Sequence, residues 1–218
     1  MCKVELLEKI ENLHMTEHLK IISPKDVIPH DAKVINTTSR SKTWSRGLSP
    51  FFLGPLKLYG DYISQNMEAA WQNSKVYIIH CDETEEQNPT KDYFEWAKAG
   101  WDNPKAVRYP MGKGAVPMYS WWDGQKLTYT EAREKIYIPL YRQIAKTKAF
   151  EYLKMEYNTR CIKNGEALYL WDFDGYDHKA IGKSYYEVMT DPKMKMGHAF
   201  VLGMLLEFGE NFTIEDLK

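Results

Sequence analysis

The spacing of hydrophobic and polar residues predicts a chain in which helices outnumber strands. Near the start, apolar residues recur at helical spacing with charged residues between them, which predicts an N-terminal helix over residues 3–20. The triplet Ser64-Gln65-Asn66 contains good helix-starting residues and predicts a second helix from Met67 to Ile79. A last helix is expected over Lys195–Phe208.

Capping signals and charge locate further elements. Thr128 and Glu131 have the spacing of a capping box, so a helix should begin at about Tyr129. Pro139 should bend this helix, because proline cannot donate the hydrogen bond of a helix interior. The window 82–95 carries six acidic residues against one lysine and is expected to be a solvated acidic face or loop.

Strand signals are short and few. Val34–Asn36 is a candidate strand, and Ala167–Phe173 alternates, is rich in aromatic residues and should end at Asp172 and Asp174. No glycine-rich strand–turn–helix segment of the dinucleotide-binding kind occurs, and no P-loop occurs. The sequence therefore predicts an α+β fold, a mainly helical single domain over residues 1–218 with a small β-sheet or hairpin element.

Composition excludes several classes of protein. The 29 Lys and Arg residues nearly balance the 30 Asp and Glu residues, and a net charge of −1 argues against a histone-like or tail-type binder. The longest apolar run, Ala199–Leu206, is far shorter than the roughly 20 residues of a membrane-spanning helix. The N-terminus does not have the pattern of a signal peptide, and the three cysteines are widely spaced. We therefore expect a cytoplasmic protein that does not bind a membrane.

The charge is balanced overall but patterned locally. Residues 33–57 contain five basic side chains and no acidic one, which predicts a basic loop that is either solvated or in contact with an anion. Aromatic residues make up 14% of the chain, including 7 Trp and 15 Tyr. This surplus either thickens the core or supplies flat surfaces for stacking bases and sugars. The basic residues of the window are Lys33, Arg40, Lys42, Arg46 and Lys57.

The most informative segment is the helix expected from Met67. Each residue of a helix turns by about 100°, so Glu68, Gln72 and Lys75 share one stripe, with Trp71 beside them. Buried charge is costly, so this stripe is either a solvated surface or a polar site. Glu68 lies in the first turn, where the helix dipole and free amides stabilise an ionised carboxylate.

This segment resembles the signature helix of the NADAR superfamily, the NAD- and ADP-ribose-associated N-glycosidases. Glu68, Trp71, Gln72 and Lys75 fall on the family pattern, whereas Ala69 stands where the family commonly has histidine. The resemblance covers about residues 44–77.

The residues before this helix resemble the lead-in of the same superfamily. There a Ser-Asn-Phe loop is followed by a short hairpin, and residues 48–52 and 54–60 correspond to these two parts. Pro50 stands near the place of the asparagine. On this resemblance, a NADAR-like core would extend over residues 33–208.

The resemblance implies cleavage of an N-glycosidic bond between a base and a ribose-like sugar. Such cleavage develops an oxocarbenium ion on the sugar and negative charge on the departing base. Glu68 would then stabilise the cation or act as the base toward water. Gln72 and Lys75 would bind polar groups, and Trp71 would stack. The role that the family gives its histidine is not carried over, because this chain has Ala69.

Basic and aromatic residues elsewhere are candidates for substrate binding. Lys113 lies within a Gly-Lys-Gly turn, and Arg108 precedes this turn in the sequence. The turn either surrounds a phosphate with its backbone amides or is solvated. Trp121 either lies beside a base or is buried in the core. If the substrate is duplex DNA, its target nucleotide must be flipped out, and Trp44 or Trp121 would be the wedge. Arg46 adds charge beside Trp44.

A third candidate segment follows the strand expected over 167–173. Asp172, Asp174 and Asp177 alternate in a way that suits cation ligands at a strand end, but the closing glutamate of an EF-hand is replaced by Lys183. We expect no metal here, and Asp174 is the candidate for a second catalytic carboxylate. His198 has the spacing of a core histidine whose hydrogen bonds are satisfied.

These observations favour an N-glycosidase that acts on a nucleotide-like or nucleic-acid substrate, and the basic windows favour a base in modified phage DNA. We expect no cofactor and infer no obligate protein partner. A non-catalytic module that binds ADP-ribose or single-stranded nucleic acid is the first alternative. A metal-dependent nucleotidyl or glycosyl transferase is the second.

Overall fold

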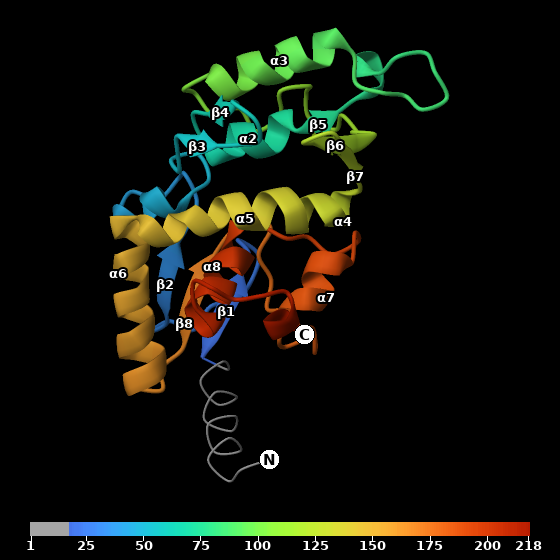
Figure 1. Ribbon diagram of the computed structural model, residues 1–218. Helices are drawn as coiled ribbons and strands as arrows, with labels where there is room; N and C mark the ends of the chain where they lie inside the picture. Colours follow the sequence, from blue (N-terminus) through green and yellow to red (C-terminus); the bar gives the residue numbers. More distant parts are fainter. Residues whose placement is uncertain (1–17) are drawn as a thin grey trace. The chain divides into compact units, whose positions relative to one another are not determined.

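The computed structural model describes residues 18–218, which divide into two compact units (Figure 1). Unit 1 contains residues 18–49 and 144–218, and unit 2 contains residues 50–143. Helices and small sheets occur in both units, which confirms the α+β class. The single domain expected over residues 1–218 stays a prediction.

A three-stranded parallel sheet forms the centre of unit 1. Strand β8 (Leu168–Trp171) lies between β1 (Leu19–Ile22) and β2 (Lys33–Asn36). Its leucines at 168 and 170 are fully buried. The strands expected at 34–36 and 167–173 are therefore confirmed, with small shifts of their ends.

Strand β1 corrects one prediction. Leu19 and Lys20, placed at the end of an N-terminal helix by their spacing, are the first residues of this strand. Leu19 pairs with Leu168, and the apolar residues of β1 are buried, so burial and pairing against β8 outweigh the local helical pattern. Residues 3–17 of the expected helix lie outside the described residues.

Helices complete unit 1. The most apolar of them is α8 (His198–Phe208), which is buried over its first eight residues and packs beside β1. It confirms the expected last helix, although the helix begins at His198, after the N-cap Gly197, instead of at Lys195. The other helical elements are η1 (Trp44–Leu48), α6 (Lys148–Tyr157), the π-helical η5 (Asn158–Lys163), α7 (Tyr185–Thr190) and η6 (Glu215–Leu217).

Unit 2 combines small antiparallel sheets with helices. The strands are β3 (Leu56–Lys57) paired with β4 (Ile63–Ser64), and β5 (Lys75–Val76), β6 (Tyr119–Trp122) and β7 (Gln125–Leu127) in that order. The β3–β4 pair forms a short antiparallel hairpin, Leu56 with Ser64 and Lys57 with Ile63. The helical elements are α2 (Met67–Asn73), η2 (Ile78–His80), α3 (Lys91–Asp102), α4 (Tyr129–Ala132), the π-helical η3 (Arg133–Tyr137) and α5 (Ile138–Tyr141). A 3-10 segment, η4 (Arg142–Lys146), crosses the division between the units.

Helix α2 begins where the sequence predicts but ends earlier. The Asn66 side chain accepts a hydrogen bond from the backbone N–H of Ala69 at 2.8 Å, which is the expected N-cap. The helix ends at Asn73 because Val76 pairs with Tyr119 in the antiparallel sheet and is fully buried there. The predicted helical path from residue 74 to Ile79 is therefore wrong.

The core of unit 2 uses much of the aromatic surplus. Helix α3, which begins inside the acidic window, buries Tyr93, Ala97 and Trp101 against Val76. The capping box at Thr128 and Glu131 is confirmed at the start of α4. No helix among residues 18–218 is long and apolar enough to span a membrane.

Candidate active site

The predicted polar stripe is a hydrogen-bonded chain on α2 and the residues after it. The Gln72 side-chain amide donates to Oε1 of Glu68 at 2.9 Å, and Lys75 Nζ donates to Oε1 of Gln72 at 2.8 Å. Glu68 is only 8% exposed, so the carboxylate is not a solvated surface group. The three side chains therefore form a partly buried polar array and not a fully solvated stripe.

Two local features place the Glu68 carboxylate. Because Asn66 caps α2, Glu68 lies in its first turn, where the dipole favours negative charge. The Glu68 backbone N–H donates to the Pro50 carbonyl at 3.1 Å, and the Met67 N–H donates to the Leu53 carbonyl at 2.8 Å. The segment after Ser49 therefore anchors the start of the helix, and the carboxylate is held on a fixed backbone.

Lys75 has an environment that weakens its hold on a proton. Burial lowers the pKa of Lys75 to about 8, and the negative charge of Glu68 only partly opposes this shift. The ammonium lies 5.0 Å from the centre of the Trp71 ring, in a cation–π contact. Lys75 is therefore a charged donor near neutral pH that can release its proton more readily than an ordinary lysine.

Aromatic rings surround Trp71. Its ring centre lies 5.0 Å from that of Tyr137 and 6.2 Å from that of Tyr129. The guanidinium of Arg133 lies 4.2 Å from the Tyr129 ring centre, and the Tyr137 and Tyr141 rings are stacked at 6.1 Å. Sequence reasoning missed this group of side chains, although a signal for it exists. Tyr129, Arg133, Tyr137 and Tyr141 recur at every fourth position, a spacing that places them on one helix face.

The chemical capacity of this array follows from its parts. It offers a carboxylate, an amide and an ammonium in hydrogen-bonded order, with an indole alongside. A carboxylate can stabilise positive charge or take a proton from water, and an ammonium can donate to a developing anion. The array therefore has groups for both ends of a bond that breaks heterolytically.

Two other predicted binding residues lie in unit 1. Trp44 begins η1 and is 37% exposed, with its ring centre 5.7 Å from that of Tyr152. Arg46 is an exposed residue of the same 3-10 turn. Trp44 and Arg46 thus belong to a different compact unit from Glu68.

The remaining predicted binding residues of unit 2 are outside the α2 array. Arg108 lies over the Tyr109 ring at 5.5 Å, and Lys113 is exposed in a turn whose flanking glycines, Gly112 and Gly114, both have positive φ. Trp121 is partly buried and packs edge-on against Phe94 at 6.1 Å. Its contacts are those of the buried-aromatic alternative.

The three aspartates after β8 have separate partners. Asp172 is buried and accepts from His198 Nδ1 at 3.1 Å, whereas Asp174 lies 3.5 Å from Lys195 Nζ and Asp177 lies 3.5 Å from Lys20 Nζ. Within residues 18–218 no three His, Cys, Asp or Glu side chains are grouped as a metal site would require. His198 also contacts the Thr37 carbonyl at 2.9 Å through Nε2, so it is a core histidine with both nitrogens bonded.

Comparison with known proteins gives a family without an assigned activity. A model described as a family of unknown function (DUF6939) matches residues 17–178, which is most of the chain. Neither a curated protein nor a solved structure matches the sequence. The family match includes the whole α2 array and Asp174 but ends before α8.

Proposed function

We propose that this chain, which belongs to the DUF6939 family, hydrolyses the N-glycosidic bond between a base and a sugar in a nucleotide-like or nucleic-acid substrate. The observation that carries the proposal is the Glu68–Gln72–Lys75 hydrogen-bonded chain beside Trp71. The likeness of these four residues to the NADAR signature helix supports the same chemistry.

The array divides the reaction between two charged groups. Water attacks the anomeric carbon, the carbon–nitrogen bond breaks, and its electron pair remains on the base nitrogen. Glu68 stabilises the cationic sugar and takes the proton of the attacking water, and the Lys75 ammonium donates a proton to the base. Proton exchange with solvent afterwards restores both groups.

Gln72 and Trp71 have positioning and binding roles in this scheme. The Gln72 amide accepts from Lys75 and donates to Glu68, so it holds both reactive groups at a fixed separation. Trp71 offers an aromatic face for the base, and the tyrosines beside it fix the orientation of the indole. The carboxylate and the ammonium supply the charge stabilisation of this step, and the scheme uses no metal ion.

The substrate class follows from the chemistry of the chain as a whole. The lysine residues of 98–148 are exposed and suit a phosphate-bearing substrate, including a modified base in DNA. If the substrate is a duplex, the target nucleotide must leave the stack before it reaches Trp71. The widely spaced cysteines suit a reducing compartment, so we place this activity in the cytoplasm.

The decisive test is release of a free base. Wild-type protein is incubated with nucleotides and with natural and modified phage DNAs, and the small products are identified by mass spectrometry. We expect one base to be released, and we expect Glu68→Gln to lower the rate by about 100-fold or more, as loss of one preorganised electrostatic group does. Glutamine keeps the oxygen that accepts from Gln72, which limits the structural change.

A matched control separates catalysis from folding. Glu134 is an exposed glutamate of the same unit, so Glu134→Gln should keep the wild-type rate. Thermal unfolding and circular dichroism would establish that Glu68→Gln is folded. A wild-type rate in folded Glu68→Gln removes the carboxylate from the mechanism, and substrate binding without base release by the wild type favours the non-catalytic binding module.

A further inference from the structure

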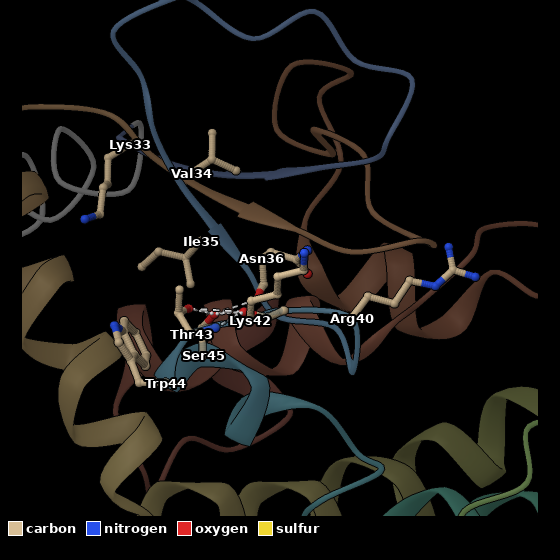
Figure 2. A pocket seen from close by; sticks show the side chains of 10 residues that line it. Lys33, Val34, Ile35, Asn36, Arg40, Lys42, Thr43, Trp44 and Ser45 are labelled. Carbon is tan, nitrogen blue, oxygen red and sulfur yellow. Dashed lines mark hydrogen bonds between the residues drawn. The ribbon is translucent and has the colours of Figure 1, made fainter.

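A second candidate site lies in unit 1, along the edge strand β2 and the loop after it (Figure 2). The cavity has a volume of about 450 Å³, and its lining extends from Lys33 to Ser45. Its charged lining residues are Lys33, Arg40 and Lys42, and none of its lining residues is acidic. A concave surface with three cations and no carboxylate is suited to an anionic ligand.

Two of these cations are available to a ligand. Lys33 is paired with Glu156 at 3.3 Å, but neither Arg40 nor Lys42 forms an ion pair with any described residue. The Arg40 guanidinium lies 5.0 Å from the ring centre of Phe173, which follows β8. This contact orients the arginine beside the carboxyl end of the neighbouring parallel strand, the side on which sheets of this kind bind ligands.

The loop that carries these cations is held by its own side chains. Asn36 Oδ1 accepts from the backbone N–H and the hydroxyl of Thr38 at 2.9 and 2.8 Å, and Thr38 Oγ1 in turn accepts from the Arg40 N–H at 3.3 Å. Ser45 donates to the Asn36 carbonyl at 2.7 Å. A loop fixed in this way loses little conformational freedom when a ligand binds.

Three hydroxyl groups converge in the segment that carries Lys42 and Trp44. Ser41, Thr43 and Ser45 lie within 3.1 Å of one another. The Ser45 proton is used on the Asn36 carbonyl, so two protons remain for three oxygen–oxygen contacts. One contact therefore lacks a proton in every arrangement. The hydroxyl of Thr43, an exposed residue, can turn toward a ligand oxygen at small cost.

Trp44 lines this cavity and also a second one, which lies along α6 and η5. The second cavity, of about 340 Å³, is lined by Trp44, Tyr152, Met155 and the polar residues Glu156, Thr159 and Arg160. In the view of Figure 2, Trp44 and Arg40 lie on opposite sides of the hydroxyl cluster. An exposed indole next to a cationic, hydroxyl-lined cavity provides a stacking surface and an anion site within one unit.

We propose that unit 1 binds a nucleoside phosphate, with the phosphate on Arg40 and Lys42 and the base against Trp44. The site is independent of Glu68 and of the hydrolysis proposed for unit 2. The proposal predicts that the base and the phosphate contribute separately to the binding affinity. The base contribution should depend on Trp44, and the phosphate contribution on Arg40 and Lys42.

Calorimetric titration with adenosine diphosphate tests the site, together with saturation-transfer NMR of adenosine and titration of inorganic phosphate. The wild type should bind adenosine diphosphate more tightly than either fragment. The double variant Arg40→Ala/Lys42→Ala should bind adenosine diphosphate about tenfold or more weakly, since it loses charge-assisted contacts, and should bind adenosine unchanged. Trp44→Ala should weaken adenosine and adenosine diphosphate but not phosphate.

Controls make failure of the site distinct from failure of the hydrolase proposal. Lys25 and Lys193 are exposed and line neither cavity, so Lys25→Ala/Lys193→Ala should bind adenosine diphosphate as the wild type does. Glu68→Gln should also bind it normally, whether or not the wild type releases a base. Undetectable binding by the wild type overturns the proposal. So does wild-type affinity in Arg40→Ala/Lys42→Ala or in Trp44→Ala.

Discussion

Replacing Lys75 by methionine should stabilise the protein while abolishing its activity. Methionine has about the length of the lysine stem and carries no charge, so it fills the same space beside Trp71. A purely structural lysine would give the opposite result for stability, because its removal would only delete contacts. The variant therefore separates a residue held for chemistry from one held for folding.

The size of the stability gain expected for Lys75→Met follows from the lowered pKa of Lys75. Its pKa falls from 10.5 to about 8, chiefly through burial, and this difference corresponds to about 3 kcal/mol of unfavourable free energy for the charged form. Methionine removes that cost but also removes the hydrogen bond to Gln72, worth about 1 kcal/mol, and the contact with Trp71, worth about 0.5–1 kcal/mol. A net gain of about 1–2 kcal/mol at pH 7 is expected.

The pH dependence has a defined sign. Below about pH 8 lysine is charged in both folded and unfolded chains, and the full cost of burial is present. Between about pH 8 and 10.5, the ordinary pKa of a lysine, the unfolded chain holds a proton that the folded chain has lost, so wild-type stability rises with pH. The advantage of Lys75→Met should therefore be constant below pH 8 and disappear by about pH 10.5.

Denaturant unfolding of the two proteins at pH 7, 9 and 10.5 measures this difference. Exposed Lys105 of the same unit provides the control, since Lys105→Met should change stability little at any of these pH values. A destabilised Lys75→Met at pH 7, or a gain that persists unchanged at pH 10.5, refutes the assignment of a charged and partly desolvated lysine. Retained base release by this variant removes Lys75 from the proton transfer.

Two further predictions concern the outlying candidates. Lys113→Ala should raise KM for a phosphate-bearing substrate and leave kcat nearly unchanged, because a charge in the glycine turn would contribute to binding and not to the bond-breaking step; an unchanged KM at low and high salt would remove this turn from the site. Base release should continue at its full rate in excess chelator, because carboxylate and ammonium groups provide the charge stabilisation; loss of activity that magnesium or manganese restores would favour a metal-dependent transferase instead.

The sequence predicted local features of the site better than long-range ones. The Asn66 cap and the Glu68–Gln72–Lys75 stripe depend on residues within three turns of helix, and the structure contains both. The end of α2 depends on Val76 pairing with Tyr119, some forty positions later, and no local pattern records that partner. Strand β1 was missed for the same reason, because its pairing partner is β8.

For candidate residues outside the Glu68–Gln72–Lys75 stripe, the sequence likewise did not predict the tertiary contacts. Composition identified a surplus of aromatic and basic residues but could not assign each one to a compact unit. Trp121 packs in the core of unit 2, whereas Trp44 borders two cavities of unit 1, although each follows a hydroxyl-bearing residue in the sequence. Only tertiary contacts distinguish a core aromatic from an exposed stacking surface.

The contact between Asp172 and His198, which are far apart in the sequence, gives a further prediction. The Thr37 carbonyl and the Asp172 carboxylate are both acceptors, so both ring nitrogens of His198 must carry protons, and the pair is a buried ion pair. Burial alone would raise the pKa of Asp172, but the charge and hydrogen bond of His198 and the Ala199 N–H lower it overall.

Asp172→Asn keeps the shape of the side chain and removes its charge, so it leaves a buried imidazolium without a counter-ion. The loss at pH 7 should be about 3–5 kcal/mol. Because the pKa of Asp172 is lowered on folding, its stabilising effect is full above about pH 4, the unfolded value, and is lost as pH falls through the folded value. The difference in free energy of unfolding between the wild type and Asp172→Asn should therefore become smaller as the pH falls. Asp174→Asn is the matched control, since Asp174 lies beside exposed Lys195 and its loss should cost at most about 1 kcal/mol. Equal acid sensitivity of the wild type and Asp172→Asn would contradict the ion pair.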